Sequence, residues 1–260
     1  MNQIQGQVLS STKIIPAVYL LWIQAPEVAS AAEPGQFVMM HCGSKTDPLL
    51  RRPFSIHRAT EDRIAILFKV VGDGTERIAN YHQGDSIDLI GPLGKGFCID
   101  SEASHLLLIC GGIGIAPLFF LAEKALDVGK SVTLLSGAST ASQLYPRDKI
   151  PSQICLHQVT EDGSEGNTGM VTDIVTQHAN LANPTTQVFA CGPLSMYQTM
   201  SHKTEFEGKA VQISLEVRMG CGIGICHGCS IKTKLGAKRA CLDGPVFDLH
   251  DILWEQFDTP

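Results

Sequence analysis

HLLLICGGIGIAP, residues 105 to 117, is the stretch that decides the fold. His105 to Cys110 is a nearly continuous apolar run, which is typical of a strand buried on both faces of a parallel sheet. Glycines then make a turn, and Ala116 to Val128 is predicted to be a helix with Pro117 in its first turn. Further strands are expected over 132–136, 154–159, 187–191 and 211–215. This alternation predicts a central open parallel α/β sheet.

The first hundred residues have a different texture, with short runs of β-forming residues separated by turn signals. The expected strands are 18–23, 36–40, 64–71 and 86–90, with one helix from about Thr75 towards Tyr81. Such spacing predicts an N-terminal antiparallel β-barrel. We therefore expect three parts: a barrel over 1–100, an α/β domain over 101–215 and a small C-terminal segment over 216–260.

Composition narrows the function classes. The chain has 260 residues, 44% of them hydrophobic, and a net charge of −6. An acidic chain repels phosphate backbones, so we expect no nucleic-acid binding. Its longest apolar run, Leu106 to Ile115, is too short to span a bilayer and contains glycines. The N-terminus lacks the pattern of a secretory signal, so a cytoplasmic location is expected.

Four of the nine cysteines stand close together: Cys221, Cys226, Cys229 and Cys241. The spacing C-x4-C-x2-C followed by a fourth cysteine is that of plant-type 2Fe–2S ligation, and the glycines between them allow a loop to wrap a cluster. A structural zinc site and a His227 ligand are the alternatives. The segment has little else to fold around, so its folding is expected to depend on the metal. The scattered Cys42, Cys98, Cys110 and Cys155 are expected to be buried small hydrophobes.

Four other motifs suit phosphate or nucleotide binding. They are Arg52-Pro53-Phe54-Ser55, Gly74-Thr75, Gly111-Gly112-Ile113-Gly114-Ile115-Ala116-Pro117 and Cys191-Gly192-Pro193. An arginine holds phosphate through two parallel hydrogen bonds, and glycines between strand and helix let a pyrophosphate approach the backbone. Each motif alone has a plainer interpretation: a surface arginine, a helix N-cap, a bare glycine turn and a buried structural cysteine.

In order along the chain, these motifs resemble the R-x-[FY]-[ST], G-T, G-G-x-G-x-x-P and C-G-P elements of ferredoxin–NADP reductase-like flavoproteins. The match covers roughly residues 1 to 215. With the cysteine motif added, the whole chain resembles the electron-transfer subunits of class 1B dihydroorotate dehydrogenases. The resemblance implies FAD, a 2Fe–2S cluster and NAD(H) as co-substrate, with FAD on the barrel and the nicotinamide cofactor on the α/β sheet.

The resemblance also implies roles for individual residues. Arg52 would pair with the FAD pyrophosphate and Ser55 would reach the isoalloxazine edge. The other expected cofactor contacts are Pro53, Phe54, Lys69, Val70, Val71, Gly74, Thr75, Gly111, Gly112, Gly114, Pro117 and Gly192. Cys191 would be the catalytic residue, beside the nicotinamide carbon that donates hydride.

No acid–base constellation for dihydroorotate oxidation is evident, so the substrate chemistry must belong to a partner. The resemblance implies an FMN-containing dihydroorotate dehydrogenase catalytic subunit, two of each chain in a heterotetramer, with electrons flowing from dihydroorotate to NAD. Ile223 and Ile225 form part of an expected apolar docking surface, or alternatively pack on the tail near Leu253 or Trp254. Two rival functions are a reductase of the same fold serving ferredoxin, a hydrogenase, sulfur reduction or an oxygenase, and a non-catalytic module with structural zinc.

The stretch Gly137 to Ser142, after the second expected sheet strand, contains no arginine. Binding of a 2′-phosphate usually requires a basic partner at this position. The sequence therefore predicts NADH over NADPH, unless Arg147 folds back to the site.

Overall fold

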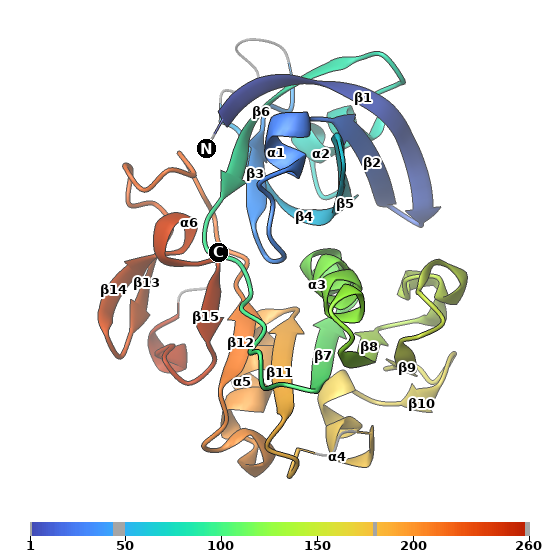
Figure 1. The fold of residues 1–260 in the computed structure, drawn as a ribbon, viewed down its shortest axis with the longest axis vertical. Helices are drawn as coiled ribbons and strands as arrows, with labels where there is room; N and C mark the ends of the chain where they lie inside the picture. Colours follow the sequence, from blue (N-terminus) through green and yellow to red (C-terminus); the bar gives the residue numbers. More distant parts are fainter. Residues whose placement is uncertain (1, 44–49, 179–180, 258–260) are drawn as a thin grey trace.

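The computed structural model describes residues 2–43, 50–178 and 181–257, and Figure 1 shows their arrangement. Among these residues, six strands close into an antiparallel barrel in the order β1-β2-β5-β4-β3-β6. The strands are β1 (Asn2–Ile15), β2 (Val18–Gln24), β3 (Phe37–Met40), β4 (Arg52–Thr60), β5 (Arg63–Lys69) and β6 (Ser86–Leu93), and the barrel also carries the helices α1 (Pro26–Ala29) and α2 (Asp73–Ala79).

The barrel closes because its strands alternate inward and outward side chains, as the pleat of a strand requires. In β6, Ile87, Leu89, Gly91 and Leu93 are buried, while the residues that alternate with them are partly or fully exposed. Ile87 and Leu89 join an apolar core that includes Leu21 and Ile66, and Leu93 joins a second group with Phe37 and Met39. The predicted N-terminal antiparallel barrel is confirmed. The strands β1 and β4 were not predicted, because polar residues interrupt their apolar ones.

The rest of the chain is built on a sheet in which β7 (His105–Gly111) is the buried parallel strand that the opening motif predicted, and β7 lies near the centre of this sheet. The described residues give it seven strands in the order β10-β9-β8-β7-β11-β12-β15. The other strands are β8 (Ser131–Ala138), β9 (Cys155–Thr160), β10 (Asn167–Thr168), β11 (Thr186–Cys191), β12 (Val211–Ser214) and β15 (Val246–Asp248). Pairing is parallel from β10 to β12, which confirms the predicted parallel α/β sheet, and only β15 runs antiparallel.

Helices cover both faces of this sheet, as expected for a parallel sheet. The helix α3 (Ile115–Asp127) packs on the face of Leu106 and Leu108, whereas α5 (Leu194–His202) packs on the face of Leu107 and Ile109. Also present are α4 (Val175–His178) and short 3-10 turns, η1 (Gly112–Gly114), η2 (Ala141–Gln143), η3 (Arg147–Lys149), η4 (Val171–Asp173), η5 (Thr204–Phe206) and η6 (Trp254–Gln256). Figure 1 shows α3 between the barrel and the sheet. None of the helices in the described ranges is long and apolar enough to span a membrane.

The C-terminal segment contains a hairpin of β13 (Ser230–Thr233) and β14 (Gly236–Arg239), then α6 (Ala240–Asp243) and β15. The expectation that it has little but metal to fold around is wrong. Its strand β15 pairs with β12, and Trp254 stacks on Tyr197 of α5 with ring centroids 5.7 Å apart. The segment is therefore anchored in the core of the sheet independently of any cluster.

The four scattered cysteines divide into two kinds. Cys42 and Cys110 are fully buried, as predicted, and burial raises the pKa of each thiol to about 11. Cys98 and Cys155 are exposed, which contradicts the prediction. Cys98 lies in the segment that joins the barrel to the sheet, and its backbone N–H and carbonyl form hydrogen bonds with the side chains of Gln187 and Gln212. Cys155 is the first residue of β9.

Candidate electron-transfer site

The four clustered cysteines lie where the C-terminal segment meets the barrel. Every one of their sulfur atoms accepts a backbone N–H bond. Cys221 Sγ accepts from Ile223 and Cys226 at 3.4 Å, Cys226 Sγ from Gly228 at 3.4 Å, Cys229 Sγ from Cys241 at 3.5 Å and Cys241 Sγ from Gly224 at 3.1 Å. Backbone donors of this kind stabilise negative charge on thiolates that ligate an iron–sulfur cluster.

The pKa values of the thiols reflect this crowded arrangement. Burial opposes ionisation of Cys221, yet the N–H donors of Cys226, Ile223 and Ile225 lower its pKa to about 6. For Cys241, burial and the neighbouring Cys229 raise the pKa to about 12. Because like charges at close range oppose one another, four thiolates require positive charge between them. The donor set therefore fits a thiolate-ligated cluster.

The sulfurs lie as two neighbouring pairs, Cys221 with Cys226 and Cys229 with Cys241, each close enough for a thiol hydrogen bond. In the part of the chain that the structure describes, no three His, Cys, Asp or Glu side chains group as ligands of a metal ion would. Two pairs suit a centre with two irons better than the single tetrahedral ion of a zinc site. His227, the alternative ligand, has an exposed side chain.

Glycines let this loop fold against the barrel. Gly222 has φ +72° and lies so close to Met39 of β3 that a Cβ atom would meet the Met39 side chain at 2.3 Å. Only glycine adopts such a backbone without cost in so little space. On the other side of the loop, the Arg239 guanidinium donates to the Gly224 carbonyl at 2.6 Å. These contacts hold the cluster loop between the barrel and α6.

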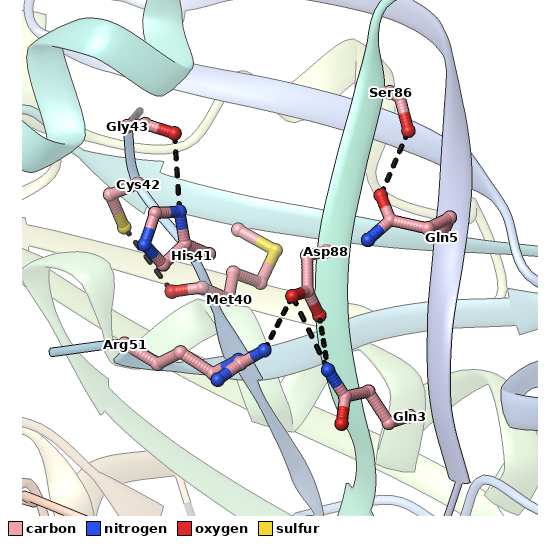
Figure 2. A network of polar contacts seen from close by, with 9 residues as sticks. All are labelled: Gln3, Gln5, Met40, His41, Cys42, Gly43, Arg51, Ser86 and Asp88. Carbon is pink, nitrogen blue, oxygen red and sulfur yellow. Dashed lines mark hydrogen bonds and ion pairs between the residues drawn. The ribbon is translucent and has the colours of Figure 1, made fainter. Parts of the chain in front are cut away.

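The strand β4 begins at Arg52, the arginine expected to bind the flavin pyrophosphate. The preceding Arg51 donates to Asp88 of β6, which Gln3 of β1 also contacts (Figure 2). Arg52 is exposed, and its guanidinium donates to the carbonyl of Leu50 at 2.8 Å. The Arg51 side chain is therefore occupied by its ion pair with Asp88 inside the barrel domain, whereas the Arg52 side chain lies at the surface, where it is accessible to a phosphate group.

Other predicted flavin contacts lie along the same barrel edge. Phe54 is buried and meets Phe68 edge-on at 5.7 Å, whereas its neighbours Pro53 and Ser55 are half-buried on the other face of β4. Lys69 and Val71 are exposed and Val70 is half-buried. The Val71 side chain is 78% exposed.

The predicted Gly74-Thr75 element lies at the start of α2. The Thr75 hydroxyl accepts from the backbone N–H of Val71 at 2.9 Å and of Gly72 at 3.2 Å, and donates to the Gly72 carbonyl at 2.8 Å. The N-cap of α2 is Gly72, so Thr75 is the third residue of the helix and not its N-cap, and its hydroxyl accepts the N-cap N–H from inside the first turn. Because the Thr75 hydroxyl is occupied in this way, a phosphate would contact the backbone of Gly74 and Thr75 and not that hydroxyl.

Arg52→Ala is expected to weaken FAD retention by about 1.5–3 kcal/mol, because a charge-assisted bond to phosphate is lost. Equilibrium dialysis or fluorescence titration of the apoprotein with FAD measures this change. Arg63→Ala is the matched control, since Arg63 is also an exposed barrel arginine and pairs with Asp62. Equal FAD affinity in the two variants would mean that Arg52 has no part in flavin binding.

The two nicotinamide motifs meet at the carboxyl edge of the sheet. Cys110 and Cys191 are paired residues of the adjacent strands β7 and β11. A Cβ atom on Gly114 would lie 1.9 Å from the Cys191 carbonyl oxygen, so this glycine is required for the two loops to touch. Gly112, by contrast, has φ +53° and faces open space. The Gly112 backbone is therefore accessible to a ligand, at the sheet edge where open α/β sheets bind them.

Gly111 and Pro117 support this arrangement. Gly111 lies against Pro193, which is exposed, and Gly192 is buried beside Met196 of α5. Pro117 is buried in the first turn of α3, where its missing N–H costs no helix bond. The predicted residues of both loops thus come together, although the sequence alone did not reveal that glycines 111 and 114 serve loop packing.

The Cys191 side chain is buried and donates to the Ser214 carbonyl at 3.6 Å. Burial and the nearby charge of Glu216 raise its pKa well above the ordinary value, so the thiol stays protonated. Tyr197 holds the same turn, because its hydroxyl accepts from the Gly192 N–H at 2.9 Å and donates to Ser214. Sequence reasoning missed Tyr197 and Glu216, since neither belongs to a recognisable motif.

Comparison with known proteins places this site in a family. Residues 216–253 match the model of the iron–sulfur cluster binding domain of dihydroorotate dehydrogenase B, and residues 108–202 match that of the oxidoreductase NAD-binding domain. The chain is 37% identical to the dihydroorotate dehydrogenase B (NAD(+)) electron transfer subunit of Desulforamulus reducens, over 96% of this chain and 98% of that one. This chain belongs to that family.

A second relative carries the same name, and two solved structures have a similar fold. The subunit of the same name from Listeria monocytogenes is 36% identical over 97% of this chain and 99% of its own length. Among solved structures, an NADH-dependent reduced ferredoxin-NADP oxidoreductase studied for flavin-based electron bifurcation matches with a TM-score of 0.84 and 29% identity, covering 97% of this chain and 91% of that chain. A ferredoxin NADP+ reductase from Neisseria gonorrhoeae, 19% identical with a TM-score of 0.66 over 82% of this chain and 98% of that one, shares the fold.

Proposed function

We propose that this chain is the electron-transfer subunit of an NAD-dependent dihydroorotate dehydrogenase. The observation that carries the proposal is the set of four cysteine sulfurs, each accepting a backbone N–H, in a segment that packs against a flavin-type barrel and is joined to a nicotinamide-type sheet. FAD supplies the exchange between hydride transfer and single electrons, and the 2Fe–2S cluster carries single electrons. The general reductase reading is disfavoured, because the relatives named as dihydroorotate dehydrogenase subunits match nearly the whole chain.

Each part of the chain has its own task in this proposal. The barrel domain over 1–100 holds FAD with Arg52, Ser55 and the segment 69–75. The sheet domain over 101–215 holds NAD(H) on the 111–117 loop. Cys191 and Gly192 lie beside that loop and orient the nicotinamide. The segment over 216–260 holds the cluster through Cys221, Cys226, Cys229 and Cys241. Since the thiol of Cys191 is buried and protonated, it would act by shaping the site rather than as a nucleophile.

The oxidation of dihydroorotate belongs to a catalytic partner subunit. We propose that this partner carries FMN, that the complex is a heterotetramer with two of each chain, and that it works in the cytoplasm. The proposed compartment is consistent with the five remaining cysteines of the described chain, which are all free thiols.

Co-expression with the catalytic subunit tests the function. The two chains are expected to co-elute on size exclusion and to couple dihydroorotate oxidation to NAD+ reduction, whereas this chain alone should reduce artificial acceptors with NADH but leave dihydroorotate unchanged. Separate elution with no NAD-linked orotate formation would leave a general reductase of this fold.

A contact of the residue that follows β8 supports a preference for NADH over NADPH. Glu161, which follows β9, accepts a bond from the Ser139 hydroxyl at 2.9 Å, so a carboxylate lies where an adenosine 2′-phosphate would be expected. Arg147 lies instead near His157, whose pKa is lowered by burial, by His178 and by Arg147. A like charge at this site costs binding energy, so NADPH should reduce the flavin about tenfold less efficiently than NADH or worse.

Stopped-flow reduction by each nucleotide measures this preference as a ratio of kcat/KM. Glu161→Gln should narrow the ratio, and Glu207→Gln, an exposed glutamate elsewhere, should not. Equal efficiency of NADPH and NADH with the native chain would contradict the assignment.

A further inference from the structure

His57 is a fully buried histidine, with 0% exposure, at the junction of the barrel and the sheet. It lies on β4 two residues after Ser55, and its side chain reaches across to α3. Its Nδ1 atom is 3.0 Å from the Ala116 carbonyl oxygen, and its ring centroid is 4.6 Å from that of Phe119. His57 lies outside the Arg52–Ser55 motif and the other cofactor-binding motifs of the chain.

The contacts of His57 fix its protonation. A carbonyl can only accept, so Nδ1 must carry the proton and donate to Ala116. Nε2 is then an acceptor, and it faces the hydroxyl of Tyr145 at 3.4 Å. Burial lowers the pKa of His57 to about 3, so the ring stays neutral throughout the physiological range. A neutral ring with one defined tautomer acts as a fixed brace and not as an acid or a base.

The two ends of this brace are the parts that must be aligned for hydride transfer. One end is the strand that carries Arg52 and Ser55, the proposed flavin contacts. The other is Ala116, inside the 111–117 loop that is proposed to hold the nicotinamide. The hydrogen bond therefore links the flavin strand directly to the nicotinamide loop, without passing through the segment that joins the two domains.

We infer that His57 is a positioning residue that sets the spacing between the flavin strand and the nicotinamide loop. This inference rests on the proposed function. The step that depends on this spacing moves one hydride, two electrons with one proton, from NADH to the flavin and leaves NAD+. Because such a step needs its reacting atoms within a narrow range of distance, a displacement of about 1 Å can lower its rate by up to about a hundredfold.

A second link between the same two elements provides a control. Arg58, the next residue, pairs with Glu123 of α3 at 2.7 Å, but seven residues beyond Ala116 and in contact with solvent. It joins barrel and helix without touching the 111–117 loop. Glu123→Gln therefore neutralises this interdomain ion pair and removes one of its two acceptor oxygens, while leaving the His57 bond in place.

The sharpest test compares His57→Asn with His57→Gln. Both introduce a buried amide, but the Asn amide occupies the place of Nδ1 and can still donate to Ala116, whereas the Gln amide occupies the place of Nε2 and cannot. With the isolated, FAD-loaded chain, we expect the limiting rate of flavin reduction at saturating NADH to fall about tenfold or more in His57→Gln. It should stay within about threefold of native in His57→Asn and Glu123→Gln, and the half-saturating NADH concentration should change little in all three.

Hydrogen–deuterium exchange of the 111–119 peptide in the FAD-free chain gives a readout independent of activity. It should quicken in His57→Gln and not in His57→Asn. Equal rates and equal exchange in the two amide variants would overturn the inference and make His57 a packing residue. Should His57→Gln not fold, His57→Phe, which keeps a ring against Phe119, takes its place in the same comparison. Failure of NADH to reduce even the native chain would instead refute the proposed function.

Discussion

Cys226→Ser is expected to remove iron and sulfide from the chain while leaving the rest of the fold intact. A serine hydroxyl ionises far less readily than a thiol, so it is a poor replacement for a cluster ligand. The surrounding segment should stay docked, because β15 remains in the sheet and Trp254 remains stacked on Tyr197. Iron and sulfide analysis per FAD is the primary measurement, and far-UV circular dichroism reports the fold.

The functional consequence separates the two halves of the electron path. NADH-dependent reduction of an artificial two-electron acceptor should persist in Cys226→Ser, since the barrel and the nicotinamide loops are untouched. NAD-linked orotate formation by the assembled complex should fall to background. Cys98→Ser, an exposed cysteine outside the cluster, is the matched control. Full iron and sulfide occupancy in Cys226→Ser would refute the ligand assignment.

Features encoded in a short continuous stretch of the chain were predictable from the sequence. The apolar run of β7 followed by glycines, and the cysteine spacing, each identify one structural unit, because a buried parallel strand and a cluster loop both impose their own residue types. The strands β1 and β4 were missed for the opposite reason. Polar residues interrupt both, such as Gln3 and Gln5 in β1 or Arg52 and Arg58 in β4, so no continuous run of β-forming residues marks them.

Long-range contacts were not predictable. His57 is one polar residue in a strand, and nothing near it in sequence indicates that Ala116, far along the chain, is its partner. The same holds for Tyr197, which closes the Cys191 turn, and for β15, which returns to pair with β12. For Ile223 and Ile225 the sequence left two environments open, a docking surface or packing on the tail near Leu253 or Trp254. In the structure Ile223 packs in the apolar group of Met39, apart from the tail residue Trp254, which belongs to another core group.

Ile225 has the environment of a docking residue. Its side chain is 74% exposed, between the ligands of the cluster, and Leu242 of α6 is 46% exposed beside the same loop. Cys226, the next residue, is the exposed one of the four proposed ligands. Apolar side chains beside the proposed cluster loop are suited to a partner that must come close to the cluster, and burying an isoleucine contributes about 1.5–3 kcal/mol.

Ile225→Asp is therefore expected to weaken the complex with the catalytic subunit by about a hundredfold or more, because it removes apolar burial and places a charge in the interface. Co-elution of the two subunits on size exclusion and NAD-linked orotate formation should both be lost at low subunit concentration. Orotate formation should return at high partner concentration. Val128→Asp is the matched control, since Val128 is 62% exposed just after α3, on another element. Native iron content and native NADH oxidation in both variants would show that the cluster itself is unaffected. Native affinity in Ile225→Asp would exclude this patch from the interface and direct the search to the exposed face of the β13–β14 hairpin, where Leu235 is 72% exposed.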